Sequence, residues 1–227
     1  MLFLVLGRGK TGSLVADVAA EHGHGVRVIG EEENRAASAL TGPLLAAVDV
    51  VIDFTTPQAA VENLRACLAN GAHVVVGTTG WYTHLNDLKR ICERRHAGMV
   101  YGTNFSVGTQ ALFRATRDLA TGMPGYKFSI SETHHTGKLD APSGTAITLK
   151  EILQKASPAL EVEITSTREG DSCGIHVVEA RSEDDVITLR HEAFSRRGFA
   201  LGAVRAAEWL AGRTGCWNFT EIFEQLG

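Results

Sequence analysis

The opening of the chain sets a glycine-rich turn between a buried strand and a helix, and this order restricts the fold more than any other feature. Residues 2–6 form the short apolar run that is typical of a parallel strand covered on both faces. Gly7, Gly9 and Gly12 follow directly in G-x-G-x-x-G spacing and open an amphipathic helical pattern. A second strand over residues 25–29 completes a βαβ unit, which predicts a parallel α/β sheet.

Strand and helix patterns continue to alternate along the first part of the chain. We expect further strands over residues 48–54, 73–76 and 99–101, with helices over residues 58–69 and 83–94 between them. Regular alternation of this kind predicts a Rossmann-like, doubly wound parallel sheet.

The second part of the chain has a different pattern, in which strands with period-two alternation have few helices between them. A helix is expected over residues 107–120, and alternating strands over residues 126–131, 160–165, 174–181 and 185–193. Such strands predict an open mixed sheet with helices on one face, whose other face meets solvent or a partner subunit.

The end of the chain returns to a helix over residues 201–210, followed by residues 217–219 and a last helical turn. We therefore assign residues 1–105 plus 197–227 to a dinucleotide-binding domain. Residues 106–196 are assigned to a second, α+β domain for substrate binding and oligomerisation.

Composition argues against several classes of protein. Of the 227 residues, 44% are hydrophobic and 21% are charged, as in an ordinary globular protein rather than a disordered or fibrous one. Lys and Arg number 22 against 26 Asp and Glu, so the charge gives no reason to expect nucleic acid or an anionic membrane as partner. The apolar run at the start is too short to span a bilayer and lacks a basic flank.

The cysteines are scattered and form no C-x-x-C pair; they are Cys67, Cys92, Cys173 and Cys216. This spacing favours a reducing compartment, so we expect a cytoplasmic protein without a disulfide framework. Cys173 with His176 could begin a metal site, but no further ligand is suitably spaced, and we predict no metal.

The glycine turn has a physical use in nucleotide binding, although a purely structural turn is the alternative. Glycines allow a tight turn and a bare backbone, and a pyrophosphate would rest on amide groups at the start of the next helix. Glu31 or Glu32, near the expected spacing of about 20 residues, would accept hydrogen bonds from an adenosine ribose, which slightly favours NADH. Arg8, Lys10 and Arg35 could instead pair with a 2′-phosphate, so NADPH stays open, and a solvated loop is the alternative for the glutamates.

Two further turns lie where ligands of such sheets bind, outside the carboxyl ends of parallel strands. Thr55 follows one predicted strand, and residues 77–80 form a Gly-Thr-Thr-Gly turn after the next. Ordinary turn chemistry would also explain these residue types.

Residues 132–145 carry the richest chemistry. A strand delivers His134 and His135 to a loop, and Lys138 follows shortly after. Ser143–Thr145 precede an apolar helical run and therefore lie at a helix N-terminus, where free amides and hydroxyls can hold a carboxylate. The lysine and a protonated second histidine would add positive charge for the same anion. The plainer alternatives are a simple helix cap at the serine, and a histidine pair with one ring buried and one exposed.

The segment from residue 134 to residue 146, His-His-x-x-Lys-x-Asp-Ala-Pro-Ser-Gly-Thr-Ala, resembles the defining segment of the bacterial dihydrodipicolinate reductases. These are the 4-hydroxy-tetrahydrodipicolinate reductases of lysine and diaminopimelate synthesis. Residues 51–55, 77–80, 104–108 and 195–203 resemble further blocks of that family in the same order, so the resemblance covers most of the chain. It implies NAD(P)H-dependent reduction of a small cyclic dicarboxylate by a homotetramer that assembles through the open sheet.

The resemblance also implies roles for residues of this chain. His134 would transfer a proton and Lys138 would donate one. The substrate carboxylates would be held by His135, Ser143, Gly144 and Thr145. The cofactor would be held by Gly7, Gly9, Gly12, Glu31, Phe54, Gly77, Thr78, Thr79, Asn104 and Phe105. From their place in the glycine turn or after a predicted strand, we add Arg8, Lys10, Thr11 and Thr55 to the expected cofactor site.

The chain departs from the family pattern at several positions. Thr136–Gly137 stand where bulky or basic residues are usual, which predicts a more mobile loop. Thr56 stands where an arginine often helps to hold NADP, which again favours NADH. Arg196–Gly198 also differ from the commoner residues, and the short segment 33–48 is expected to lack peripheral elements of the first domain.

Two other functions stay open at this point. One is an NAD(P)-dependent reductase of another imine or carbonyl compound, which would not need a site for two carboxylates. The other is a dinucleotide-binding sensor without catalysis.

Overall fold

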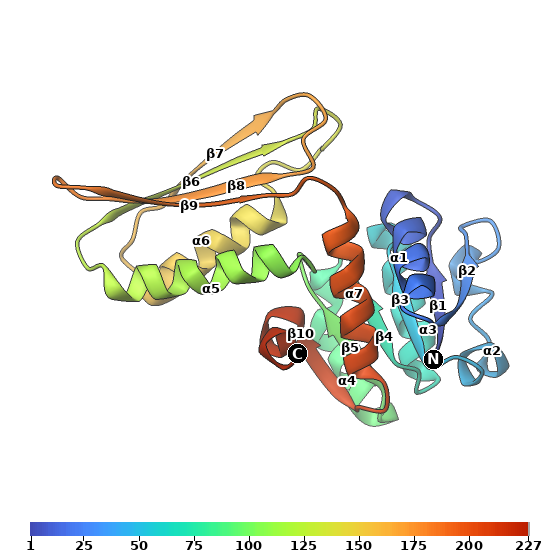
Figure 1. The fold of residues 1–227 in the computed structure, drawn as a ribbon. Coiled ribbons are helices and arrows are strands. Elements are labelled where there is room, and N and C mark those ends of the chain that lie inside the picture. Colours follow the sequence, from blue (N-terminus) through green and yellow to red (C-terminus); the bar gives the residue numbers. More distant parts are fainter. Residues whose placement is uncertain (227) are drawn as a thin grey trace. The chain divides into compact units, whose positions relative to one another are not determined.

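The computed structural model describes residues 1–226, and the chain divides into two compact units (Figure 1). Unit 1 contains residues 1–106 and the segment from residue 197 onward, and unit 2 contains residues 107–196. Within the described residues, no helix has both the length and the apolar character needed to cross a membrane.

Unit 1 is built on a six-stranded sheet with parallel pairings, in the order β10-β5-β4-β3-β1-β2. Its strands are β1 (Leu2–Leu6), β2 (Gly25–Ile29), β3 (Val50–Asp53), β4 (Val74–Val76), β5 (Gly98–Tyr101) and β10 (Gly215–Asn218). Its helices are α1 (Lys10–Glu21), α2 (Gly42–Ala46), α3 (Pro57–Ala69), α4 (Leu85–Arg95), α7 (Arg197–Leu210) and α8 (Phe219–Ile222). Short 3-10 turns are η1 (Arg35–Ala37), η2 (Tyr82–His84) and η3 (Phe223–Gln225). This architecture confirms the Rossmann-like, doubly wound sheet.

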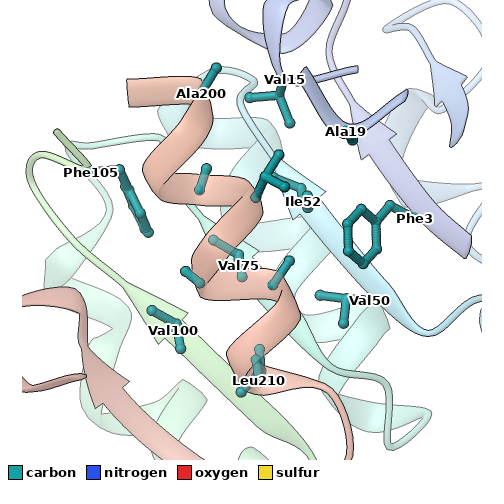
Figure 2. Packing of buried hydrophobic residues seen from close by; sticks show 14 of the residues in the cluster. Phe3, Val15, Ala19, Val50, Ile52, Val75, Val100, Phe105, Ala200 and Leu210 are labelled. Carbon is teal, nitrogen blue, oxygen red and sulfur yellow. The ribbon is translucent and has the colours of Figure 1, made fainter. Parts of the chain in front are cut away.

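Side chains of the unit 1 strands alternate between two apolar layers, one on each face of the sheet. Phe3 and Val5 of β1 point to the layer beneath α1 and α7, which Figure 2 shows from close by. Leu4 and Leu6, which are two residues apart on β1, point to the layer beneath α3 and α4. Helix α7 approaches the sheet closely because its inner face is made of small residues; a Cβ on Gly202 would come within 1.7 Å of the Phe105 carbonyl oxygen.

The sequence did not predict two features of unit 1. The segment after α7, for which only residues 217–219 and a last helical turn were expected, forms β10 and extends the sheet by pairing with β5. Its four residues, Gly-Cys-Trp-Asn, lack an alternating or β-branched pattern, so pairing with β5 rather than local preference makes them a strand. Residues 33–48, where peripheral elements were not expected, form η1 and the short helix α2.

Unit 2 is a four-stranded mixed sheet in the order β7-β6-β8-β9. Its strands are β6 (Lys127–His134), β7 (Glu163–Arg168), β8 (Ile175–Arg181) and β9 (Val186–Glu192), and its helices are α5 (Val107–Gly122) and α6 (Gly144–Ala156). The β6–β7 pairing is parallel, whereas β6–β8 and β8–β9 are antiparallel. Both helices lie on one face of this sheet (Figure 1), and strict alternation of burial along β6 confirms the expected open sheet.

Candidate active site

Unit 1 has a cleft of about 270 Å³ at the carboxyl ends of β1, β2 and β3. Ligands of open α/β sheets bind at this edge. The cleft is lined by Leu6, Gly7, Arg8, Gly9, Ile29, Gly30, Glu31, Asn34, Phe54, Thr55, Thr56, Ala59 and Asn63. The predicted cofactor residues Gly7, Arg8, Gly9, Glu31, Phe54 and Thr55 therefore come together.

The glycine turn is shaped by contacts that no larger residue would permit. Gly7 has a φ of +103°, and a Cβ there would lie 2.3 Å from the carbonyl oxygen of Phe54. A Cβ on Gly12 would lie 2.2 Å from the Gly7 carbonyl oxygen, so the first turn of α1 packs directly on the loop. Gly9, in contrast, has open space around its Cβ position and precedes α1, whose first amides have no helical acceptor. The turn thus combines a tight backbone with an exposed helix N-terminus, which suits a pyrophosphate.

A buried carboxylate holds the loops on the β3 side of this cleft. The Asp53 carboxylate accepts hydrogen bonds from Asn63 Nδ2 at 2.8 Å, Thr78 Oγ1 at 2.9 Å and Thr55 Oγ1 at 2.8 Å. Asn63 in turn accepts from Asn34 Nδ2 at 2.8 Å, which ties in the loop after β2. Burial raises the pKa of Asp53, while the hydrogen bonds oppose the rise. Asp53 was not among the predicted site residues. In the sequence, the only indication of this hydrogen-bond network is an aspartate at the end of an otherwise apolar strand.

The glutamates after β2 have different environments. Glu31 lines the cleft. Glu33 accepts a hydrogen bond from the Gly30 amide at 2.8 Å, which lowers its pKa, and it pairs with Arg8 at 2.9 Å. The third member, Glu32, is not part of the cleft lining, and all three glutamates are exposed. Of the basic residues considered for a 2′-phosphate, Arg8 is therefore already paired with a carboxylate, and Lys10 is exposed outside the cleft lining.

The remaining predicted cofactor residues of unit 1 lie outside the cleft lining, as judged over residues 1–226. They are Lys10, Thr11, Gly12, Gly77, Thr78, Thr79, Asn104 and Phe105. Gly77 packs against the Phe54 ring, where a Cβ would lie 2.2 Å from ring carbons. The Phe105 ring is buried 4.4 Å from the ring of Phe219, and Asn104 Oδ1 accepts from the Ser106 amide. Gly77, Asn104 and Phe105 therefore shape the loops rather than the walls of the cleft.

Unit 2 contains a buried cluster of charged and titratable groups at the end of β6. Glu132 is 1% exposed, His134 is 7% exposed and His176 of β8 is 3% exposed. Glu132 and His134 continue the inward-facing set of β6, because residues two apart share one face of a strand. Neither Glu132 nor His176 was among the predicted site residues.

Glu132 is the centre of this cluster. Its Oε1 accepts from Arg168 Nη2 at 2.9 Å and from the Ser143 amide at 3.2 Å. Its Oε2 lies 2.7 Å from Nδ1 of His134, off the line of an ideal hydrogen bond. Burial alone would raise the pKa of Glu132, but hydrogen bonds from Ser143, Ser166 and Arg168 outweigh it and hold the pKa at about 2. The carboxylate is therefore charged at neutral pH.

The two histidine rings of the cluster meet edge to face with centroids 5.0 Å apart. Burial lowers the pKa of both, and that of His176 falls to about 3. His176 Nε2 lies 3.2 Å from Ser143 Oγ. That hydroxyl also accepts from the Ala146 amide at 3.2 Å and so caps α6. The helix cap at Ser143 is present, and it contacts His176, which the sequence offered only as a partner of Cys173 in a metal site.

The loop between β6 and α6 carries the other predicted residues. Lys138 Nζ lies 2.8 and 2.9 Å from the two carboxylate oxygens of Asp140. Arg168 donates to the backbone oxygens of Lys138 at 3.3 Å and Asp140 at 2.5 Å. His135 Nε2 lies 3.4 Å from Nη2 of Arg196. The ammonium and both histidines thus belong to one segment, which Arg168 of β7 holds in place.

Glu132, His134 and His176 offer ligand atoms within 4.8 Å of one another, which is the spacing of a metal site. Arg168 already supplies a positive charge to the Glu132 carboxylate. Cys173, considered with His176 as the start of a metal site, has Sγ 3.9 Å from the Phe194 carbonyl oxygen. The absence of a metal stays a prediction.

Comparison with known proteins identifies the family. Residues 2–105 match the family model of the dihydrodipicolinate reductase N-terminus, and residues 108–223 match that of its C-terminus. The chain belongs to the dihydrodipicolinate reductase family. The 4-hydroxy-tetrahydrodipicolinate reductase of Christiangramia forsetii is 35% identical, with 100% of this chain and 99% of the relative covered. That of Natronomonas pharaonis is 37% identical over 92% of this chain and 94% of the relative. The chain is accordingly an NAD(P)H-dependent oxidoreductase of lysine and diaminopimelate synthesis, as the resemblance implied.

Solved structures agree in fold. A dipicolinate-bound dihydrodipicolinate reductase from Paenisporosarcina sp. TG-14 superposes with a TM-score of 0.76 at 24% identity, covering 98% of this chain and 99% of that one. An amine dehydrogenase from Mycobacterium smegmatis gives a TM-score of 0.67 at 12% identity, covering 97% and 95%. The second likeness shows that this architecture extends to dehydrogenases of other substrates.

Proposed function

We propose that this chain reduces 4-hydroxy-tetrahydrodipicolinate to tetrahydrodipicolinate, with the substrate held in unit 2 at the N-terminus of α6. The observation that carries the proposal is that one segment holds His134, Lys138 and Ser143, with Ser143 at the N-terminus of α6. A helix N-terminus and an ammonium group are the partners that a carboxylate requires. The dipicolinate held by the Paenisporosarcina relative is a cyclic dicarboxylate of this kind.

The residues of unit 1 fit a nicotinamide dinucleotide. Its pyrophosphate would rest on the amides that follow Gly9, in a loop that Gly7 and Gly12 keep free of side chains. Glu31 would accept hydrogen bonds from the adenosine ribose in the cleft. When bound, the dinucleotide supplies a hydride.

The residues of unit 2 would bind the substrate, orient it and supply a proton to it. Ser143, Gly144 and Thr145 would hold one carboxylate through the first amides of α6 and the hydroxyl groups. Lys138 and a protonated His135 would add positive charge for the same anion. Loss of the 4-hydroxy group as water leaves a conjugated imine, and reduction then adds one hydride and one proton. Lys138 would donate that proton, and His134 would exchange protons with the site.

We further propose that NADH is preferred and NADPH is also accepted. Glu31 lines the cleft, where its charge would repel a 2′-phosphate, and Thr56 stands where an arginine often binds one. Arg8, which lines the same cleft, is paired with Glu33.

The face of the unit 2 sheet away from α5 and α6 supports the proposal of a homotetramer. It presents Ser129 and Ser131 of β6, Val177 of β8 and Thr188 of β9, a mixed surface that a second sheet could cover. All four cysteines are free, which supports the reducing cytoplasm as the place of action.

The test is oxidation of NADH, and separately of NADPH, with freshly generated 4-hydroxy-tetrahydrodipicolinate. Oxidation that pyridine-2,6-dicarboxylate blocks supports the proposal, and the ratio of the two rates measures the effect of Glu31. A folded protein that binds NADH but oxidises neither cofactor would instead be a sensor. Reduction of other imines without inhibition by the dicarboxylate would indicate a different substrate.

A further inference from the structure

Glu132 has no role in the reaction as derived above, yet it is the most buried charged group of unit 2. A buried carboxylate is costly unless hydrogen bonds and a counter-charge compensate it. Here Oε1 receives two donors, the Arg168 guanidinium and the Ser143 amide, while Oε2 faces His134. The carboxylate therefore contacts the strand end, the start of α6 and β7 at once.

The close contact between Oε2 and His134 favours one position for the imidazole proton, although the two atoms are off the line of an ideal hydrogen bond. The two atoms are 2.7 Å apart, and a carboxylate oxygen has only lone pairs to offer. A lone pair on Nδ1 at this distance would be repelled, so we assign the proton to Nδ1. Nε2 then carries the lone pair. Nε2 of His134 lies next to Gly174. A Cβ on Gly174 would come within 3.0 Å of Nε2, so the glycine leaves space on this side of the ring.

Arg168 extends the same arrangement to the loop. Besides binding Glu132, its guanidinium donates to the backbone oxygens of Lys138 and Asp140. A planar fork with several donors can serve these acceptors together, which a lysine cannot do. The position of the loop that carries Lys138 thus depends on the same ion pair.

We propose that Glu132 is a positioning residue for the proposed reaction. Its carboxylate holds His134 with the proton on Nδ1, which leaves Nε2 to exchange protons, and through Arg168 it fixes the loop that carries Lys138. The inference rests on the proposed function for its kinetic consequence, but the tautomer of His134 does not depend on any substrate.

The decisive variant is Glu132→Gln, which has nearly the same shape. The two donors at Oε1 would draw the amide oxygen of glutamine toward Arg168 and Ser143, so its NH2 group would face Nδ1 of His134. Nδ1 would then have to accept, and the proton would move to Nε2. Glu132→Asp keeps a carboxylate and should retain the wild-type tautomer.

The tautomer is measured by two-bond 1H–15N correlation on the full chain labelled with 15N-histidine. The His134 signals are assigned by their loss in His134→Asn. We expect Nδ1–H in the wild type and in Glu132→Asp, and Nε2–H in Glu132→Gln. An unchanged tautomer in Glu132→Gln would overturn the inference, whether or not the protein reduces the proposed substrate.

Kinetics provide the second readout. Turnover of Glu132→Gln should fall at least about tenfold, with partial recovery in Glu132→Asp and an unchanged KM for NADH. Charged or titratable groups that act on His134 are Glu132, Lys138, Arg168, Asp140 and His176. Because the Glu132 charge favours protonated His134, its removal should also move the pH–rate limb assigned to this histidine to lower pH. Lower turnover with an unmoved limb would mean that Glu132 is merely structural.

Two further variants separate the parts of the inference. Arg168→Lys keeps a positive charge beside Glu132 but loses the donors to the loop backbone, so the tautomer should stay while dipicolinate binds about tenfold more weakly. Glu151→Gln makes the same chemical change as the decisive variant on the exposed face of α6 and should alter neither readout. Tight dipicolinate binding by Arg168→Lys would remove Arg168 from the inference.

Discussion

The buried His176 should make the folded protein sensitive to mild acid. Its folded-state pKa of about 3 lies below the ordinary histidine value of 6.5, because burial disfavours the charged ring. Between these two values the unfolded chain binds a proton that the folded chain does not. Stability from this group is therefore fully present above about pH 6.5 and is lost as pH falls toward 3.

The magnitude follows from the size of that difference. Each pH unit below the unfolded pKa costs about 1.4 kcal/mol, so at about pH 5 the free energy of unfolding should be about 2 kcal/mol lower on account of His176 alone. Glu132 adds little in this range, because its folded and unfolded pKa values of about 2 and 4.5 both lie lower. The window between pH 5 and pH 6.5 therefore isolates histidine titration.

The assay is urea unfolding followed by circular dichroism at several pH values, for the wild type and His176→Gln. Glutamine can form a hydrogen bond with the Ser143 hydroxyl but does not titrate. We expect the difference in unfolding free energy between the two proteins to shrink by about 2 kcal/mol from about pH 7 to pH 5. Above about pH 7 the two curves should run parallel, which serves as the internal control. A constant difference across the whole range would refute the reasoning. Tryptophan fluorescence is unsuitable, because Trp81, Trp209 and Trp217 all belong to unit 1.

Four other results are expected. Lys138→Ala should cut turnover at least about a hundredfold in the NADH oxidation assay, and near-normal turnover would remove it from the mechanism. Gly9→Ala should weaken NADH binding without changing the urea midpoint, because a Cβ on Gly9 has open space around it. Gly12→Ala should lower the midpoint, because a Cβ on Gly12 would lie 2.2 Å from the Gly7 carbonyl oxygen. Asn63→Ala leaves a buried oxygen of Asp53 without its donor and should destabilise the protein by about 1–3 kcal/mol in urea unfolding. Treatment with EDTA should leave turnover unchanged; loss of activity that Zn²⁺ restores would instead assign a metal to the Glu132 cluster.

The sequence was sufficient for unit 1 wherever a local pattern decides the structure. The apolar run of β1 and the glycine spacing predicted a strand, a turn and a helix, and the structure has all of them. The spacing also led to Glu31 in the cleft. It could not distinguish Glu31 from Glu32, of which only Glu31 lines the cleft, and it did not show that Glu33 accepts from the Gly30 amide and pairs with Arg8. Those contacts depend on how the loop after β2 folds back, which neighbouring residues do not determine.

The buried Glu132 cluster of unit 2 shows more clearly which contacts cannot be predicted from the sequence. Alternation along β6 places Glu132 and His134 on the inward face with Ile130, so a charged pair on the covered side of the sheet could have been inferred from period two alone. The counter-charge of Glu132, Arg168, could not be inferred in this way. Arg168 meets Glu132 only because β7 pairs in parallel with β6, in a register that sets Glu132 against Ser166 and His134 against Arg168. A shift of this pairing by one residue would turn Arg168 to the other face and leave the carboxylate buried without its counter-charge. The ion pair between Arg168 and Glu132 is thus also a constraint on the register of β6 and β7. Loss of either partner should therefore disturb both the sheet and the position of His134.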